Sequence, residues 1–315
     1  MKNLLIALFI FLSIPAHARD LTVILSSDSD GHTTVARIFG KYIAKHMDQE
    51  TKIIFKVVPG AAGLNSTNYI YNIAPKDGST IGIMFKNIPI IGVLNRTDSN
   101  INFDASKFTW LGSIADGRKD VVLLVSNKPL SDVELIVGSE TVTAANPVDF
   151  ISKYTNIKIK KVTGYVGTNN IRLAFLRNEV DAIVANLLSI LTYDREWIDT
   201  HHIILQLGNG RIRHPMFKNV PTLQEIVTDN KNASEALSIL ENQFALVRSY
   251  IAPPDIPKDR AIELQKAFRL ATQDIQFLEE AKRINLDILP IYHEEAQKIV
   301  NETYSAPKEL IDLLK

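Results

Sequence analysis

Polar and small residues directly follow the predicted strands of this chain, and their positions favour ligand binding. In open sheets of parallel strands, ligands bind just beyond the carboxyl ends of the strands, where each strand leads into a helix. The residues that we predict to contact a ligand there are Ser26, Ser27, Asp28, Gly31, His32, Thr33, Asn87, Ser139, Thr141, Tyr165, Gly167, Thr168 and Asn186. They supply hydroxyl, amide and imidazole groups and, at glycine, room for close approach of the backbone.

Several of these residues have a second interpretation that the sequence leaves open. Thr33, Thr34 and Thr168 stand at predicted helix starts, where a threonine hydroxyl commonly caps the helix. Tyr165 is either a wall of the site with a hydroxyl tip or a half-buried core residue.

The sequence contains no constellation of residues suited to catalysis. Gly-x-Ser-x-Gly, His-Glu-x-x-His, Walker lysine and Gly-x-Gly-x-x-Gly motifs are all missing. His201-His202 and His293-Glu294-Glu295 lack a third metal ligand at a suitable spacing. Asp28 and Asp30 form an acid pair without a nucleophile. We therefore expect no catalytic residue, no metal site and no cofactor.

The composition argues against several classes of protein. The 315 residues include no cysteine, so disulfides, thiolate metal sites and a cysteine nucleophile are excluded. Lysine plus arginine equals aspartate plus glutamate at 35 each, which argues against a nucleic-acid partner. The length suggests about two lobes with a large core.

The N-terminus has the pattern of a secretory leader. Lys2 precedes the apolar run 4–12, and Ala16-His17-Ala18 is the small-x-small pattern that signal peptidase cuts. The run is shorter than the about 20 apolar residues that cross a bilayer. We predict that 1–18 is a signal peptide cleaved near Ala18, which leaves a secreted protein with no direct membrane insertion. A retained anchor is the minor alternative.

Short apolar strands alternate with helical segments in two series. The strands are predicted at 21–25, 53–58, 80–85, 121–125, 135–138, 157–162, 180–184 and 203–207. This alternation indicates an α/β fold with right-handed crossovers and parallel sheets. Two segments, 121–126 and 244–252, have the sequence of extended connectors between lobes. We predict that 19–122 plus 248–315 form lobe 1 and that 123–247 form lobe 2.

The segment 59–84 combines a small-residue turn, a helix and a strand. Pro59-Gly60-Ala61-Ala62-Gly63 precedes a helix that Pro75 and Gly78 end. The small residues let the backbone come close to a neighbour or a ligand. An ordinary strand-to-helix turn is the alternative.

Several short motifs occur together along the chain. They are Gly31-His32-Thr33-Thr34-Val35-Ala36-Arg37, the segment 59–84, Phe103-Asp104 with Phe108-Thr109-Trp110-Leu111-Gly112, Gly164-Tyr165-Val166-Gly167-Thr168, Asn178-Glu179-Val180-Asp181, Pro221-Thr222-Leu223-Gln224-Glu225 and Ala252-Pro253-Pro254. Through them the chain resembles the solute-binding receptors of tripartite tricarboxylate transporters, the Bug-type receptors, from about Leu21 to the C-terminus.

The resemblance implies the fold of type II periplasmic binding proteins. This is an α/β, two-lobed clamshell with two mainly parallel sheets flanked by helices and a double-strand hinge. The resemblance also implies a monomeric periplasmic receptor that clasps a small carboxylate through backbone amides, hydroxyls and water. The receptor would deliver this ligand to the permease subunits of a tripartite transporter. Helix N-termini suit such a ligand because their N–H groups carry a partial positive charge.

The first loop departs from the family's pattern. The family commonly has a Pro-Phe-Pro-x-Gly-Gly run there with an aspartate shortly afterwards, whereas this chain has Ser26 to Asp30, with Thr33 in the aspartate's place. Asp28 and Asp30 would oppose a carboxylate within about 4 to 6 Å unless a cation intervenes. Either they point to solvent, or the ligand carries an ammonium group or differs from citrate-like acids. Two other functions stay open: a receptor that feeds a sensor kinase, and an α/β enzyme acting on small organic acids.

Overall fold

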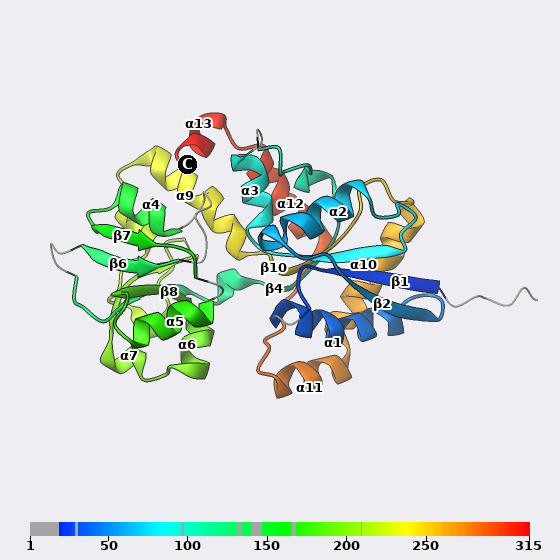
Figure 1. The fold of residues 1–315 in the computed structure, drawn as a ribbon, viewed down its shortest axis with the longest axis horizontal. Coiled ribbons are helices and arrows are strands. Elements are labelled where there is room, and N and C mark those ends of the chain that lie inside the picture. The colour runs from blue at the N-terminus through cyan, green and yellow to red at the C-terminus, as the bar shows by residue number, and fades with distance from the viewer. Residues whose placement is uncertain are drawn as a thin grey trace, which may run out of the picture.

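Two β-sheets with helices on both faces make up this structure, a computed structural model that describes residues 19–28, 31–95, 98–130, 134–139, 147–165, 168–208 and 210–315 (Figure 1). The strands are β1 (Arg19–Leu25), β2 (Thr51–Val57), β3 (Thr80–Met84), β4 (Thr109–Ala115), β5 (Val122–Ser126), β6 (Leu135–Gly138), β7 (Ile159–Val162), β8 (Ala182–Asn186), β9 (His202–Leu207), β10 (Val247–Ala252) and β11 (Ile291–Tyr292). The helices are α1 (Gly31–Lys45), α2 (Leu64–Asn72), α3 (Ile88–Leu94), α4 (Pro147–Tyr154), α5 (Thr168–Leu176), α6 (Leu187–Tyr193), α7 (Trp197–Thr200), α8 (Leu223–Ile226), α9 (Lys231–Glu241), α10 (Lys258–Gln273), α11 (Ile275–Arg283), α12 (His293–Tyr304) and α13 (Lys308–Asp312).

The strand order confirms the predicted two-sheet α/β fold and corrects one detail. The first sheet has the order β11-β4-β10-β3-β1-β2, and the second has the order β7-β6-β8-β5-β9. Each sheet is parallel over three strands, β3-β1-β2 and β7-β6-β8. The remaining pairings are antiparallel, so the sheets are not mainly parallel. The cause is connectivity: β10 enters the first sheet from the second at the carboxyl end of β3 and therefore runs against it.

Burial explains why β3 and β5 are recognisable as strands in the sequence. All five residues of β3 and all five of β5 are buried. Strands covered on both faces must be apolar on both, so they appear as continuous apolar runs and not as alternating ones. The helices α1, α10 and α11 cover one face of the first sheet, where Phe39, Tyr250 and Phe268 pack together. On its other face, Ile24, Ile70 and other apolar residues pack beneath α2 and α12.

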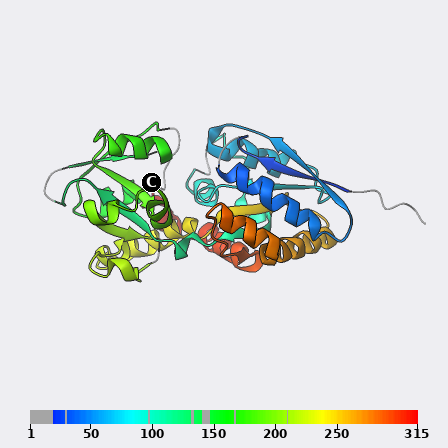
Figure 2. The same cartoon turned by 90° about the horizontal axis from the view of Figure 1, so that it is seen from below.

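The two sheets are joined by connecting segments and by a shared core. The chain passes between them through 116–121, after β4, and through 242–246, after α9 (Figures 1 and 2). The predicted connectors, 121–126 and 244–252, were largely wrong, because most of their residues form β5 of the second sheet and β10 of the first. Ile90 of α3 and Ile311 of α13 belong to the same buried cluster as Leu240 of α9 and the face of the second sheet. Figure 1 shows α13 beside α9 and α3. The division into lobes at 122 and 248 stays a proposal, because α13 belongs by sequence to lobe 1 but packs on α9.

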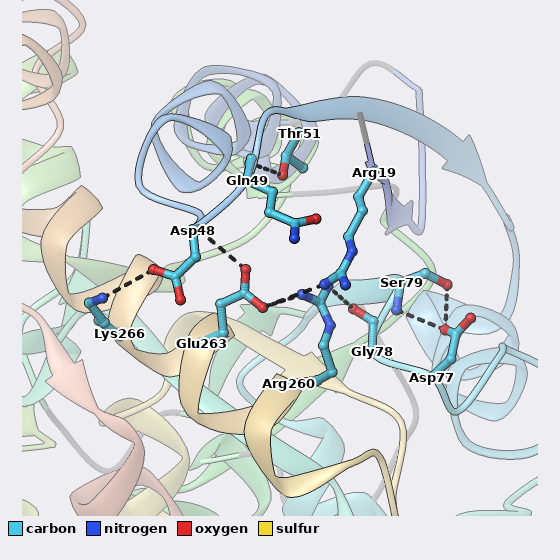
Figure 3. A network of polar contacts seen from close by, with 10 residues as sticks. All are labelled: Arg19, Asp48, Gln49, Thr51, Asp77, Gly78, Ser79, Arg260, Glu263 and Lys266. Atoms are coloured by element: carbon cyan, nitrogen blue, oxygen red, sulfur yellow. Dashed lines mark hydrogen bonds and ion pairs between the residues drawn. The ribbon is translucent and has the colours of Figure 1, made fainter. Parts of the chain in front are cut away.

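A polar network fastens α10 to the edge of the first sheet (Figure 3). Arg260 pairs with Glu263 within α10 and donates a 3.1 Å hydrogen bond to the carbonyl oxygen of Gly78, before β3. The other carboxylate oxygen of Glu263 accepts a 3.2 Å hydrogen bond from the backbone N–H of Asp48, whose own carboxylate lies 3.1 Å from Lys266. One half-buried pair thus ties three segments together.

A second polar cluster fastens α11 to the end of α1. The carboxylate of Asp274 lies 2.7 Å from Lys45 Nζ and 2.8 Å from His46 Nε2, and it accepts a 2.9 Å hydrogen bond from the backbone N–H of Gln276. Burial opposes ionisation of Asp274, but the hydrogen bonds from its partners outweigh burial and lower its pKa to about 2.

In the described part of the chain, no helix is both long and apolar enough to span a bilayer.

Candidate functional site

A hydroxyl of α1 fixes the loop that follows β1. Thr33 lies in the first turn of α1, which begins at Gly31, and is 2% exposed. Its Oγ1 donates a 2.7 Å hydrogen bond to the carbonyl oxygen of Ser27. Ser26 and Ser27 are half-buried, whereas Asp28 is exposed to solvent. Thr33 therefore orders the loop, and the exposure of Asp28 reduces its opposition to an anion.

Three loops of the first sheet meet at Phe85, directly after β3. The Phe85 ring lies 4.6 Å from the His32 ring, centroid to centroid, in an edge-to-face arrangement. A Cβ atom added to Gly63, in the loop after β2, would lie 2.5 Å from Phe85 Cδ2. Glycine is required there because φ is 89° and the ring fills the adjacent space. One aromatic side chain therefore holds the carboxyl ends of β1, β2 and β3 together.

The loop after β2 has an unusual backbone. Gly60, Ala61 and Ala62 have φ of 113°, 47° and 49°, and Asn65 closes the loop by donating a 2.9 Å hydrogen bond to the carbonyl oxygen of Pro59. A non-glycine residue at positive φ costs about 1–3 kcal/mol, and such conformations gather at ligand-binding sites. The strain favours a binding role for this segment over an ordinary turn.

The corresponding edge of the second sheet carries Ser139 and Tyr165. Ser139 is 6% exposed, and its N–H donates a 2.8 Å hydrogen bond to the carbonyl oxygen of Val162. Tyr165 is half-buried and covers the end of β6, since a Cβ added to Gly138 would lie 3.5 Å from its Cε2. The Tyr165 ring also packs against the core cluster beneath α5. Thr168, the first residue of α5, is exposed.

Asp120 binds the end of β8 at the junction of the two sheets. Its carboxylate accepts a 3.0 Å hydrogen bond from Asn186 Nδ2 and a 2.9 Å hydrogen bond from the backbone N–H of Leu188 in α6. Burial raises the pKa of Asp120, against these hydrogen bonds and the charge of Lys86. Lys86 lies over the Phe244 ring, 4.8 Å from Nζ to centroid. The Asn186 amide is thus already bound to Asp120.

The structure gives less detail on the surroundings of the remaining predicted residues. Asn87 is half-buried just before α3, and its side chain does not cap that helix. Thr141 and Gly167 lie outside the described residues. The ligand contacts of all thirteen predicted residues stay predictions.

Solved structures with a similar fold cover almost the whole chain. A TctC solute binding protein from Polaromonas has a TM-score of 0.66 at 14% identity, over 96% of this chain and 99% of that one. MatC from Rhodopseudomonas palustris, with bound malate, has a TM-score of 0.63 at 16% identity, over 94% and 99%. The periplasmic binding protein BugD has a TM-score of 0.63 at 15% identity, over 94% and 96%. The chain has the TctC and Bug solute-binding fold.

This solute-binding fold is established by structure and not by sequence. No protein-family model matches the chain, and no curated protein matches it. At such low identities the likeness concerns the fold, and in that respect it confirms the resemblance found in the sequence motifs.

A hollow of about 650 Å³ lies away from the predicted site of this solute-binding fold. It is lined by His201, Ile203, Met216 and neighbouring residues, around the start of β9. Because β9 pairs antiparallel with β5, and β5 with β8, this hollow lies at the amino end of β8, opposite Asn186. Among the described residues, no group of three histidine or acidic side chains could hold a metal ion.

The sequence interpretation missed Phe85, Lys86 and Asp120. Phe85 and Lys86 satisfy the rule that selected Asn87, since they directly follow β3, but an aromatic ring and a lysine were not sought there. Asp120 precedes β5, and only the pairing of β5 with β8 brings it to Asn186. No sequence signal marks that contact.

Proposed function

We propose that this protein is an extracytoplasmic solute-binding receptor that captures a small carboxylate between two lobes and delivers it to a tripartite tricarboxylate-type transporter. The observation that carries the proposal is the convergence of the loops after β1, β2 and β3 on Phe85, in a chain whose fold matches solute-binding proteins over 94–96% of its length. The ligand would bind at this edge of the first sheet, opposite the loops at Ser139 and Tyr165.

The proposed mechanism is closure about the connecting segments. Two segments cross between the sheets, at 116–121 and 242–246, and a few terminal residues of this kind can absorb a hinge rotation. A ligand closes the protein only by binding the closed form more tightly than the open one. The ligand would bridge the loops at Thr33 and Tyr165 when the protein closes. The contacts made to both loops in the closed form would supply this difference in affinity.

The ligand class rests on the neighbours and on the electrostatics of the fold. MatC, whose structure contains malate, shares the fold. The N-termini of α1 and α5 present N–H groups with a partial positive charge, worth about 0.3–1 kcal/mol each to a bound anion. We extend the carboxylate specificity to this chain as part of the proposal, with a dicarboxylate as the simplest ligand for two facing helix ends.

The cellular setting follows from the same proposal. The protein is secreted to the periplasm after cleavage near Ala18, acts as a monomer and docks on permease subunits in the membrane. It is a binding protein and not an enzyme, since its structural neighbours are solute-binding proteins.

A thermal-shift screen tests this function. Succinate, malate, adipate and citrate are added separately to the mature chain, with amino acids and aromatic acids as comparison sets. A ligand at 100 times its Kd adds about 2.7 kcal/mol to the free energy of unfolding, which gives a clear rise in Tm. The proposal predicts such a rise with at least one carboxylate. No rise with any acid, or turnover of the acid that binds, would refute it.

A further inference from the structure

Arg248 lies at the same edge of the first sheet and has not yet been assigned a role. It is the second residue of β10, next to Ser249, which pairs with Met84 at the end of β3. The sheet order therefore places Arg248 beside Phe85, where the loops after β1, β2 and β3 meet. Its φ is 59°, a left-handed conformation that a residue with a long side chain rarely adopts.

The side chain of Arg248 is half-buried, and the Nε of its guanidinium is the enclosed part. Its Nε has no hydrogen-bond partner within the described part of the chain and is closed off from solvent. Burial lowers the pKa of Arg248, and among the described residues only Tyr250 acts against this. The hydroxyl of Tyr250, fully buried two residues further along β10, also has no hydrogen-bond partner there.

The nearby carboxylates that could have paired with Arg248 already bind other donors. Asp116, after β4, accepts hydrogen bonds of 2.9 and 2.8 Å from the guanidinium of Arg118. Asp120 accepts from Asn186 and Leu188. An enclosed guanidinium nitrogen without a hydrogen bond and a strained backbone are both unfavourable, and a protein that keeps both at one residue commonly uses them at a functional site.

We propose that Arg248, supported by the Tyr250 hydroxyl, is the direct binding group for a carboxylate of the ligand. A guanidinium presents parallel N–H donors that match the two oxygens of a carboxylate, and it keeps its charge when buried. The inference rests on the proposed function and adds to it a cationic contact that the family resemblance did not predict. Arg248 would also supply the cation that offsets the repulsion between an anionic ligand and the carboxylates Asp28 and Asp30 of the first loop.

Binding measurements on three variants test the inference. The acid that raises the Tm of the wild type is titrated calorimetrically into the wild type, Arg248→Met, Arg248→Lys and Tyr250→Phe. We expect Kd to rise at least tenfold for Arg248→Met and less for Arg248→Lys, which keeps the charge but not the fork of donors. Succinamide, the uncharged counterpart of succinate, should bind neither the wild type nor the variants. Arg269→Met, which removes an exposed arginine of α10 paired with Glu294, is the control and should leave Kd unchanged.

The Tm of the ligand-free variants separates binding from a structural role. An arginine that serves only ligand binding does not stabilise the ligand-free protein, so ligand-free Arg248→Met should have a Tm no lower than that of the wild type. An arginine kept for the fold would instead lower Tm when removed, and that result, or a Kd within twofold of the wild type, would overturn the inference. If Arg248→Met does not fold, an unchanged Kd in Arg248→Lys and Tyr250→Phe also overturns it. A wild type that binds no acid refutes the proposed function itself.

Discussion

Replacing Gly63 with alanine should destabilise the protein through a clash with Phe85. The new Cβ would lie 2.5 Å from Cδ2 and 2.9 Å from Cε2 of the ring, so the ring must move. Alanine at positive φ costs about 1–3 kcal/mol, and forcing a packed ring aside costs about 1–3 kcal/mol, against about 0.4–1 kcal/mol gained from the stiffer unfolded chain. We expect Gly63→Ala to lower the free energy of unfolding by about 3 kcal/mol.

Gly210→Ala is the matched control for this variant. Gly210 also has a positive φ, 56°, but no described atom lies within 4 Å of its added Cβ. The unfolded-state gain is common to both variants, but φ 56° lies in the left-handed region open to alanine and φ 89° lies outside it. The difference between the variants therefore contains the clash, about 1–3 kcal/mol, and the extra backbone strain at Gly63. Urea unfolding followed by circular dichroism measures both.

A second substitution tests whether Phe85 is the cause. Phe85→Leu in the Gly63→Ala background removes the ring atoms that clash and should return part of the lost stability, which a double-mutant cycle measures. The ligand found by thermal shift should bind Gly63→Ala more weakly, because a displaced ring no longer holds His32 in place. If Gly63→Ala is as stable as Gly210→Ala, the loops do not converge as described.

Three further substitutions test the electrostatics of the fold. Asp274→Asn should lower the free energy of unfolding by about 1–2 kcal/mol at pH 7. This figure converts the lowering of the Asp274 pKa from 3.8 to about 2 at 1.36 kcal/mol per pH unit and reduces the result for solvent screening. In urea titrations, only the wild type should lose this stability as the pH falls from about 4 towards 2. Burial raises the pKa of Glu241, which accepts a hydrogen bond from the N–H of Gly208, so its ionisation destabilises the fold as the pH rises above the ordinary value of 4.5. Glu241→Gln should therefore make Tm depend less on pH between pH 4.5 and 8. An unchanged slope would contradict this. Arg260→Met should cost about 1–3 kcal/mol because the half-buried Glu263 loses its closest cation and keeps only Arg19, 4.0 Å away, and the N–H of Asp48. Lys266→Met, at an exposed pair, should cost less than about 1 kcal/mol in the same urea assay.

The parts of the fold that could be predicted are those where burial dictates residue type. The predicted strands 21–25, 80–85 and 135–138 correspond to β1, β3 and β6 because buried parallel strands must be apolar on both faces. Three strands of the first sheet were not predicted as strands: β4, although its five central residues are buried, β10, which was predicted as a connector, and the two-residue β11. These strands pair antiparallel, and their pairing depends on tertiary contacts.

The sequence predicts a position for the candidate site but not its detail. The rule that ligands bind at the carboxyl ends of parallel strands selected Ser27, Thr33 and Asn87, which the structure places after β1, in the first turn of α1 and just before α3; their ligand contacts stay predictions. The same rule could not show that the Thr33 hydroxyl is directed to the Ser27 carbonyl, because hydrogen-bond partners depend on the loop conformation.

Arg248 shows which residues of this edge escape a rule based on the carboxyl ends of strands. It stands at the amino end of β10, in a segment with the sequence of a connector, and parallel-strand rules select only carboxyl ends. It reaches the edge because β10 enters the sheet antiparallel to β3, which reverses the end that lies beside the ligand loops. On the proposed role of Arg248, the first residues of the strand that returns to the first sheet contribute to the ligand site together with the residues that follow β1 and β3. A search of chains with this fold for charged residues at the start of the returning strand would find candidates that strand-end rules omit.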